Sequence, residues 1–340
     1  MTKVSNSEIK REAANIFSYG RQDAAPFYNR EESKKEIVKK CKTFQSGDVL
    51  FLSALLGAGK SFFIDHIGWQ LGKTENSLFI RDVTKKLLKR KNDILFFDEA
   101  DIKTSWEDLR RGLTLIAEHI VETGQKAVIV GDYCLYAGQL AGIFNRKDYL
   151  NSFEPLDRIF LKGILESRIS TFLNRKNPEP IVDEALMNIL VPEEMTPVAT
   201  FRTILTMLAR LVRRLPANNE PCMVTLDTAK KWVQEEYDPN LETYRQEDYL
   251  NILLDYFNRE YPGGKGLQNG LKTKQLFDVA SETKTKYESI AEFESEIIVP
   301  FTRNELLISN GVPFLNEKGD FVRRPEPFLP SIPLLLLAEI

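Results

Sequence analysis

The spacing of hydrophobic residues divides the chain into stretches with two different periods. Short apolar runs predict β-strands in "DVLFLSAL", "NSLFIRDV", "NDILFFDEAD", "KAVIVGDY" and "DRIFLKGI". Two segments between these runs have helical spacing, "SFFIDHIGWQLG" and "SWEDLRRGLTLIAEHIVETG". In the second segment, Leu109, Leu113, Ile116 and Ile120 fall on one helical face. Strands that alternate with helices predict an α/β fold with a parallel sheet covered on both faces.

The pattern changes after about residue 165, where the strand-like runs stop. Helices are predicted in "ILESRISTFLNR", "IVDEALMNILV", "TFRTILTMLARLVRRL" and "LDTAKKWVQEEY". Further on, "QEDYLNILLDYFNREY" and "KTKYESIAEFESEI" predict two more helices, and short β-like pieces with turn residues follow. This order fits a small C-terminal α/β domain of the winged-helix type. We therefore expect a division into residues 1–47, 48–164, 165–236 and 237–340.

Composition mainly excludes classes of protein. The 340 residues suit two or three domains, and 43% hydrophobic with 28% charged residues is typical of a soluble globular protein. No apolar run is long enough to span a bilayer, and the N-terminus lacks the apolar core of a signal peptide. We therefore expect a cytoplasmic protein without membrane association. The cysteines and histidines are too few and too scattered for a disulfide framework or a metal cluster: Cys41, Cys134, Cys222, His66 and His119.

A candidate nucleotide site lies in "LSALLGAGKSFF", residues 52–63, between the first predicted strand and helix. Gly59, Lys60 and Ser61 match the end of the phosphate-binding pattern G-x-x-x-x-G-K-[ST], whose first glycine is replaced by Ala54. Such a loop directs backbone N–H groups at phosphates, its lysine reaches the β- and γ-phosphates, and its serine ligates Mg²⁺. Alanine fits the first position if its φ is negative. We expect the loop to bind ATP through Ala54, Leu55, Leu56, Gly57, Ala58, Gly59, Lys60, Ser61 and Phe62.

The apolar strand in "ILFFDEAD" provides the second part of the expected site. It ends in Asp98 and Glu99, and carboxylates at the end of a buried strand are costly unless they are paired or near a metal. We expect Asp98 to hold Mg²⁺ through water and Glu99 to act as the general base for the attacking water. The literal "DEAD" does not indicate an RNA helicase, because no second RecA-like lobe follows.

Taken together, these residues resemble the AAA+ ATPases of the P-loop NTPase superfamily, most of all the origin-recognition and replication-initiator clade. "FYNREESKKEIVKKC", residues 27–41, is similar to the segment that helps to form the adenine pocket in that family, which implies a nucleotide contact for Arg30. The resemblance covers roughly residues 20–236. It implies an N-terminal helical segment with the adenine-pocket region in 1–47, a P-loop ATPase core in 48–164, a helical lid in 165–236, and a winged-helix-like domain in 237–340.

The resemblance also assigns roles to residues beyond the two motifs. Asp132, at the end of "AVIVGDY", occupies the sensor-1 position that orients the water or the γ-phosphate, although an aspartate there could instead cap the next helix. Arg202 lies in the segment that resembles the sensor-2 helix. Arg158, in "FEPLDRIFL", is at about the place of the arginine finger, with Arg146 as a rival. A finger that acts on a neighbouring subunit implies a homo-oligomer.

Two segments are candidates for nucleic-acid contacts. "YPGGKGLQNGLKTKQL" brings Lys265, Lys272 and Lys274 together with glycines, and Arg323 and Arg324 follow a turn where a winged helix would have its wing. Such groups can contact phosphates without reading sequence. A solvated linker and a solvated strand end explain them equally well, and the net charge of −3 does not support a uniformly basic binding surface.

Two functions remain in competition. The first is an oligomeric AAA+ ATPase that hydrolyses ATP with Mg²⁺ and acts on DNA or on a DNA-associated protein complex. The alternative is a nucleotide-gated scaffold or regulator of a partner nuclease or transposase, without direct DNA binding. A small-molecule kinase is less favoured, because such kinases seldom place a glutamate directly after the acidic strand end and lack a helical lid of this length.

Overall fold

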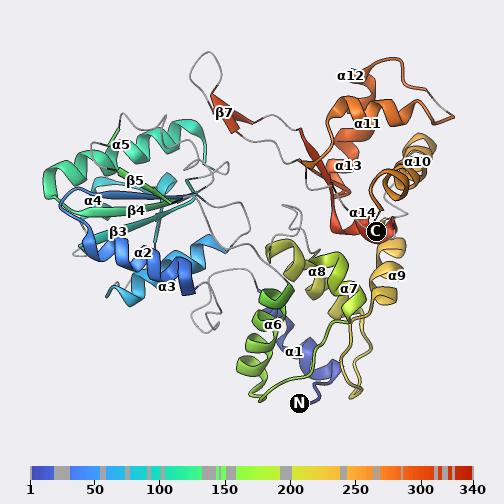
Figure 1. Cartoon of the computed structure of the whole chain (residues 1–340), viewed down its shortest axis with the longest axis horizontal. Coiled ribbons are helices and arrows are strands. Elements are labelled where there is room, and N and C mark those ends of the chain that lie inside the picture. Colours follow the sequence, from blue (N-terminus) through green and yellow to red (C-terminus); the bar gives the residue numbers. More distant parts are fainter. Residues whose placement is uncertain are drawn as a thin grey trace. The chain divides into compact units, whose positions relative to one another are not determined.

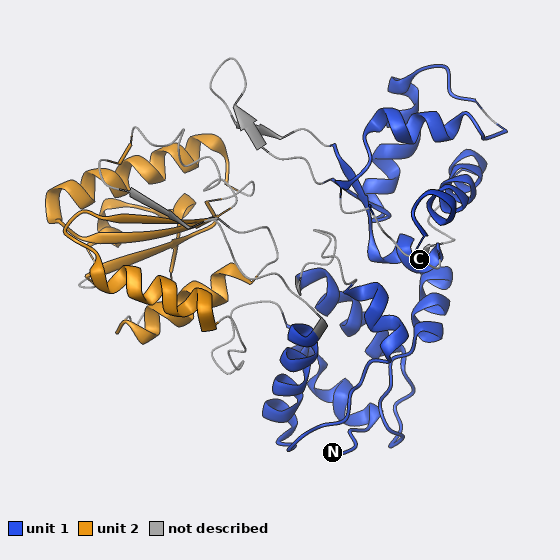
Figure 2. Cartoon of the chain, viewed as in Figure 1, with its two compact units in different colours: residues 1–18, 156–314, 322–340 blue, residues 19–155, 315–321 orange. Residues whose placement is uncertain are grey.

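A computed structural model describes residues 2–18, 31–53, 59–72, 77–89, 93–100, 104–131, 143–144, 147–150, 158–191, 201–237, 243–262, 266, 269–284, 286–309, 313–315, 321–323 and 326–338. The chain divides into two compact units, coloured separately in Figure 2. The core unit contains residues 19–155 and 315–321, and the helical unit contains residues 1–18, 156–314 and 322–340. Residues 1–47, which the sequence suggested as one segment, are therefore shared between the two units.

The core unit is built on a five-stranded sheet with the order β2-β3-β4-β1-β5, in which every neighbouring pair is parallel. Parallel neighbours cannot be joined by a tight hairpin, and in the described residues α3 lies between β1 and β2, α4 between β2 and β3, and α5 between β3 and β4. In chain order the elements are α2 (Glu31–Thr43), β1 (Val49–Ser53), α3 (Lys60–Gln70), β2 (Leu78–Phe79), the 3₁₀ turn η1 (Ile80–Asp82), α4 (Lys85–Leu88), β3 (Ile94–Asp98), α5 (Trp106–Thr123), β4 (Lys126–Gly131) and β5 (Lys147–Leu150).

Side chains that alternate along the strands bury both faces of this sheet. On β1, Val49 and Phe51 pack in the cluster formed with α5, η1 and α4, whereas Leu50 and Leu52 pack in the cluster formed with α2 and α3. Figure 1 shows α5 on one side of the sheet and α2 and α3 on the other. The expected α5 face is confirmed, since Leu109, Leu113, Ile116 and Ile120 are all buried in the first cluster. The parallel, doubly covered sheet predicted from the sequence is therefore confirmed.

Local signals explain where α5 begins and ends. The side chain of Ser105 accepts a hydrogen bond from the Asp108 N–H, which satisfies one of the free donors of the first turn. Gly124 ends the helix in the left-handed region, with φ of 71°, and its N–H donates to the carbonyl of Ile120.

Two of the predicted strands differ in the structure. The run "NSLFIRDV" forms only the two-residue β2 and then turns into η1. The strand predicted in "DRIFLKGI" is wrong, because helix α6 (Arg158–Leu173) begins there and the last strand of the sheet is β5. A short apolar run cannot be assigned from periodicity alone. Phe160, Leu161, Ile164 and Leu165 are buried at helical spacing.

The helical unit begins with α1 (Asn6–Ile16), which packs against α6 and α8. The buried Arg168 of α6 fastens its end, because Nη1 donates to the carbonyl oxygens of Ile16, at 2.9 Å, and of Ser18. Burial lowers the pKa of this guanidinium to about 10, so it stays charged at neutral pH. The further helices of this part are α7 (Glu184–Leu190), α8 (Phe201–Arg214) and α9 (Leu226–Tyr237), as the sequence predicts.

The C-terminal part of the helical unit combines helices with short strands. Leu271 forms an isolated antiparallel bridge to Phe328 of β9, which in turn pairs with β6. The described residues of this part thus form helices and short strands, and the winged-helix type expected from the sequence stays a prediction. The elements are α10 (Tyr244–Glu260), α11 (Thr273–Ala280), α12 (Ile290–Phe293), the π-helical turn η6 (Glu294–Ile298), α13 (Val299–Arg303), β6 (Leu307–Ser309), the paired β7 (Pro313–Leu315) and β8 (Phe321–Arg323), β9 (Phe328–Pro330) and α14 (Ile332–Leu337).

None of the described helices combines the length and the apolar character that a membrane crossing requires.

Candidate nucleotide-binding site

Helix α3 begins with an N-terminus that no side chain caps. Its N-cap is Gly59, held at φ of 79°, and no acidic residue lies in the first turn. Other helices of the chain differ, because α1 and α10 are capped by the side chains of Ser5 and Thr243. The N–H groups of an uncapped first turn, together with the helix dipole, attract anions. The start of α3 therefore has the properties of a phosphate site.

Glycine is favoured at position 59 by the left-handed backbone and not by lack of space, because a Cβ there would meet no atom of the described residues within 4 Å. The next residue, Lys60, is buried, with 6% of its surface exposed, and Ser61 and Phe62 are half-buried. Ala54, Leu55, Leu56, Gly57 and Ala58, the rest of the expected loop, lie outside the described residues.

Asp98 ends β3 on the same face of the sheet as α3. Side chains alternate along a strand, and Phe96, two residues earlier, packs in the cluster with α3. The carboxyl group of Asp98 is 1% exposed, and its Oδ1 accepts a hydrogen bond of 2.8 Å from the Glu99 N–H. Asp98 directly follows Phe97, which pairs with Ile129 of β4. Lys60, Ser61 and Asp98 thus share one face at the carboxyl edge of the sheet, where open α/β sheets bind ligands.

Glu99 leaves the strand in an unusual conformation. Its φ is 62°, which few residues other than glycine adopt. The Thr104 hydroxyl donates to its carbonyl oxygen at 2.7 Å and fixes the turn. Its side-chain oxygen Oε2 is buried and accepts no hydrogen bond within the described part of the chain, but it lies 3.3 Å from Nη1 of Arg81. A strained residue with an incompletely bonded carboxylate is typical of functional sites.

Arg81 is the residue of this site that sequence reasoning missed. It lies in η1, its guanidinium stacks over Phe79 with 5.2 Å to the ring centre, and its carbonyl accepts a hydrogen bond from Arg111. The only signal in the sequence is an arginine directly after an apolar run, "LFIRD", and such residues are common on surfaces. Its pairing with Glu99 depends on the neighbouring positions of β2 and β3.

Gly131 allows β3 and β4 to approach one another beyond the paired strands. The Ala100 N–H donates to the Val130 carbonyl at 3.0 Å, and a Cβ on Gly131 would lie 1.9 Å from the Ala100 carbonyl oxygen. No side chain other than hydrogen fits at this position. The glycine therefore sets the path of the chain that follows Asp98 and Glu99.

The remaining predicted residues fall into two groups. Asp132 and Arg30, like Arg146, lie outside the described residues. Arg158 is the first residue of α6 and not, as expected, a residue before the last strand, and nothing of its side chain is described. Arg202 is half-buried on α8. Both of these arginines belong to the helical unit, whereas Lys60, Ser61, Asp98 and Glu99 belong to the core unit.

The donor groups suit Mg²⁺ better than a transition metal. Within the part of the chain that the structure describes, no three His, Cys, Asp or Glu side chains are placed to hold a metal ion. Mg²⁺ does not need such a cage, because it is usually held by one or two carboxylates, water and the phosphates of the substrate. The hydroxyl of Ser61 and the buried carboxylate of Asp98 are oxygen donors of the kind that this ion prefers.

The titratable groups behind the site serve packing. Burial, followed by the nearby Lys34, lowers the pKa of His66 on α3, so the ring is neutral at pH 7. Cys41 is buried against the same side of the sheet, and burial raises the pKa of its thiol to about 12. Neither group is poised for catalysis at neutral pH.

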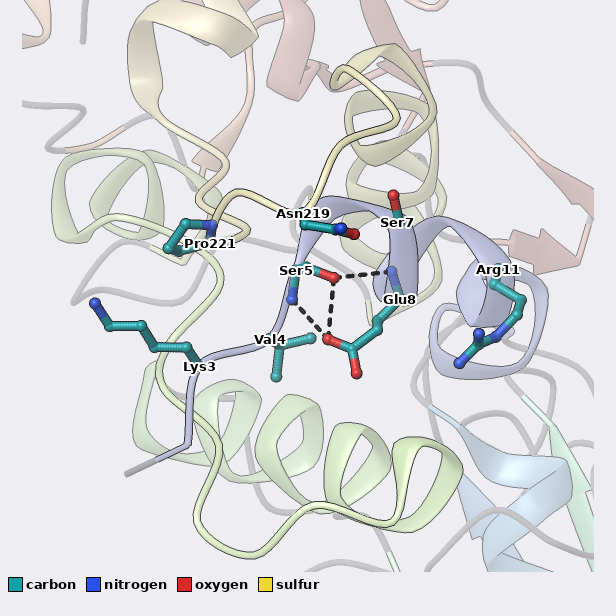
Figure 3. Close-up of a pocket in the computed structure, with 8 residues that line it drawn as sticks. All are labelled: Lys3, Val4, Ser5, Ser7, Glu8, Arg11, Asn219 and Pro221. Carbon is teal, nitrogen blue, oxygen red and sulfur yellow. Dashed lines mark hydrogen bonds between the residues drawn. The ribbon is translucent and has the colours of Figure 1, made fainter.

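A separate hollow of about 510 Å³ lies at the start of α1 in the helical unit (Figure 3). Its polar groups already have structural roles. Ser5 and Glu8 form a capping box, in which the Ser5 N–H donates to Glu8 Oε2 at 2.9 Å and the Glu8 N–H donates to Ser5 Oγ at 3.3 Å. The first turn of α1 is capped in this way, unlike that of α3, which no side chain caps.

No family model matches the chain, and no curated protein matches it. Among solved structures, it is similar to Drosophila ORC bound to DNA, at 12% identity and a TM-score of 0.45 over 98% of this chain and 92% of that one. It is also similar to the Aeropyrum pernix ORC1 protein in complex with DNA, at 13% identity and a TM-score of 0.44, covering 97% and 96%. A Walker-type ATPase of Pyrococcus abyssi is similar at 13% identity and a TM-score of 0.39, covering 96% and 100%.

In its own elements, the chain has a parallel sheet with the Gly-Lys-Ser turn after β1 and the acidic residues at the end of β3. The α/β fold with a parallel sheet, followed by a helical part, is the fold that the sequence predicted.

Proposed function

We propose that the core unit binds ATP with Mg²⁺ and hydrolyses it. The observation that supports this most is the uncapped N-terminus of α3, with Lys60 and Ser61 in its first turn, on the same face of the sheet as the buried Asp98. The N–H groups of the turn and Lys60 hold the β- and γ-phosphates. Ser61 and Asp98 hold the Mg²⁺ ion, which neutralises charge on the phosphates when bound.

Glu99 is the proposed general base, and it must first separate from Arg81. A carboxylate 3.3 Å from a guanidinium is engaged by that charge and is not directed at a water molecule. The two side chains are 19% and 45% exposed, so the pair is weak enough to open. We expect that nucleotide or partner binding shifts Glu99 towards the attacking water.

The other predicted residues complete this proposal. Arg30 contributes to the adenine pocket, Asp132 orients the water or the γ-phosphate, and Arg202 contacts the γ-phosphate. Arg158, with Arg146 as its rival, reaches the nucleotide of a neighbouring subunit and stabilises charge in the transition state. The mass of the assembly with and without ATP, and the rate of hydrolysis, should be measured for Arg158→Ala and Arg146→Ala. The variant that still assembles with ATP but hydrolyses it slowly identifies the arginine finger.

The test compares two variants in one assay of ATP binding and phosphate release. Lys60→Ala removes a charged hydrogen-bond donor worth about 2–3 kcal/mol, so ATP should bind roughly 100-fold more weakly. Glu99→Gln should still bind ATP but hydrolyse it roughly 100-fold or more slowly. The exposed Lys85→Ala and Glu107→Gln are matched controls with no expected effect. ATP binding that Lys60→Ala leaves unchanged would contradict the proposal.

The target of the ATPase has two candidates, DNA or a partner protein. The lysines of "YPGGKGLQNGLKTKQL" are only weak support for DNA binding. Lys265 lies outside the described residues, and Lys274 pairs with Asp278 at 3.2 Å. One observation favours the partner protein, namely that the third helical segment of the C-terminal part is acidic. Charge reversal at Lys265, Lys272 and Lys274 distinguishes the candidates. If these lysines contact DNA, the affinity for DNA should fall steeply, and if the target is a protein, it should not change.

A further inference from the structure

The third helical segment of the C-terminal part, residues 290–303, consists of α12, η6 and α13 in one run. In a winged-helix arrangement this would be the segment placed for nucleic-acid recognition, and recognition requires positive charge. Its basic residue is Arg303, whereas its acidic residues are Glu292, Glu294 and Glu296. Over residues 243–340 the chain has 11 Lys and Arg against 15 Asp and Glu. Phosphate groups would be repelled from this surface.

Two of these carboxylates pair with an arginine of α10. Arg245 of α10 donates to Glu292 at 3.0 Å and also to Glu296, and its guanidinium lies 4.2 Å from the ring centre of Tyr287. Hydrogen bonds from the Glu288 N–H and from Arg245 lower the pKa of Glu292, so it stays ionised. Glu294 is different, because it is exposed, lines a separate groove and has no ion-pair partner in the described part of the chain.

A groove of about 350 Å³ lies between this segment and the strands β6 and β9. Its floor is apolar, formed by Ile298 and by Phe328 of β9, which are 5% and 2% exposed. Val299 lines it while keeping 50% of its surface exposed. Glu294 and Arg303 also line it, and Arg303 likewise has no ion-pair partner among the described residues. The π-helical turn η6 coincides with this groove, and such turns occur often at functional sites.

The two charges set the pattern that an occupant must carry. Glu294 and Arg303 are nine positions apart, which corresponds to about 13 Å along a helix at 1.5 Å per residue. An extended peptide covers about 13 Å in four residues. A peptide with a Lys or Arg four residues from an Asp or Glu could therefore contact Glu294 and Arg303 at the same time. An apolar side chain between the two charges would contact the apolar floor.

We propose that this groove binds an extended segment of a partner protein that carries a basic and an acidic residue on either side of an apolar one. Duplex DNA offers only negative charge and no apolar side chain, so it fits neither Glu294 nor the floor. The proposal rests on the second candidate target above, a partner protein, and is independent of nucleotide chemistry in the core unit.

The test uses the full chain and a set of labelled, end-capped nine-residue peptides in a fluorescence anisotropy titration. The peptides carry Lys-x-Leu-x-Glu, Glu-x-Leu-x-Glu, Lys-x-Leu-x-Lys or Lys-x-Ser-x-Glu at the centre of the same neutral flanks. The first should bind most tightly, and replacement of its leucine should weaken binding about tenfold. Val299→Asn should cause a similar loss.

Charge reversal in the protein should change the preference between peptides. Glu294→Arg leaves two positive groups beside the groove, so the Glu-x-Leu-x-Glu peptide should become the best ligand. Arg303→Glu leaves two negative groups, so Lys-x-Leu-x-Lys should become the best ligand. Glu288→Lys and Ile290→Asn are matched controls, because both residues are exposed on or just before the same segment but do not line the groove. They should leave the order of the peptides unchanged.

Several results would overturn the proposal. No binding of any peptide at millimolar concentration would do so, as would an order of affinities that the two charge reversals leave unchanged. Duplex DNA binding that Val299→Asn abolishes would assign the groove to nucleic acid instead. Self-association that Val299→Asn abolishes would assign it to a second copy of the chain. Since ATP hydrolysis is measured separately, a failure here leaves the ATPase proposal standing, and the reverse also holds.

Discussion

At the carboxyl edge of the core sheet, charged groups occupy buried positions: Lys60 is 6% exposed and Asp98 is 1% exposed. Around residues 290–303, charged groups lie at the surface and largely neutralise one another, as Arg245 does with Glu292 and Glu296. Burial of charge is costly unless the charge is paired or binds a ligand, so the first arrangement is consistent with the proposed phosphate and metal site. Paired surface charges contribute little to stability and leave only Glu294 and Arg303 to act on a partner.

The two regions also differ in what produces their geometry. The core site depends on the backbone: a left-handed Gly59, a left-handed Glu99 and a close approach at Gly131. The C-terminal groove depends on side chains presented by a helix. We therefore expect substitutions that disturb the backbone to have large effects in the core, and substitutions of charge to have small effects on stability elsewhere.

The largest effect is expected for Gly131→Ala. A Cβ 1.9 Å from the Ala100 carbonyl oxygen forces β3 and β4 apart, which should lower the free energy of unfolding of the core unit by about 3 kcal/mol or more. ATP affinity should fall as well, because Asp98 and Glu99 precede Ala100. Chemical denaturation and ATP titration measure the two effects.

Gly72→Ala is the matched control for this prediction. Gly72, unlike Gly131, has a positive φ, of 83°, and a Cβ there meets no atom of the described residues within 4 Å. It should lose only about 1–2 kcal/mol from backbone strain and keep its ATP affinity. Equal effects of the two substitutions would show that the close approach at Gly131 does not set the site.

Arg81→Ala tests the ion pair between Arg81 and Glu99. Loss of the guanidinium removes the group that engages Glu99, so the basal rate of ATP hydrolysis should rise about two- to fivefold, which corresponds to 0.4–1 kcal/mol. Steady-state phosphate release at saturating ATP measures it. Arg110→Ala, an exposed arginine on α5, is the control. A rate that falls with Arg81→Ala would mean that Arg81 assists catalysis directly.

The smallest effect concerns Glu8 in the helical unit. Hydrogen bonds from the Ser5 N–H and from Arg175 lower the pKa of Glu8 to about 2, well below its value of 4.5 in the unfolded chain. A lowered pKa stabilises the fold above pH 4.5, and this contribution is lost as the pH falls towards 2. Because the side chain is partly exposed, the contribution is about 1 kcal/mol. Urea unfolding of Glu8→Gln should show this loss at pH 6 and no difference from the unchanged chain near pH 2.

Glu12→Gln is the control, since Glu12 lies on the same helix and its ion pair with Arg11 is long, at 3.6 Å. Its unfolding should follow that of the unchanged chain at both pH values. A Glu8→Gln variant with unchanged stability at pH 6 would contradict a stabilising role of the ionised Glu8 carboxylate.

The sequence by itself determined the parallel sheet and the places of Lys60, Ser61, Asp98 and Glu99, because hydrophobic alternation and the phosphate-loop pattern are local signals. It also predicted the face of α5 correctly. It could not determine the secondary structure of "DRIFLKGI", because this apolar run is short enough for a strand but forms the start of α6. The helix is favoured there because buried neighbours cover one of its faces, and those neighbours are distant in sequence.

Only the tertiary structure brought Arg81 to Glu99, Arg168 to the end of α1, and Arg245 to Glu292 and Glu296. Each of these contacts joins residues that are far apart along the chain, and no periodicity records such a pairing. The same reason applies to the groove along residues 290–303. The sequence shows glutamates and one arginine in a polar helix, but only the packed structure separates the carboxylates held by Arg245 from Glu294, which remains available to a partner.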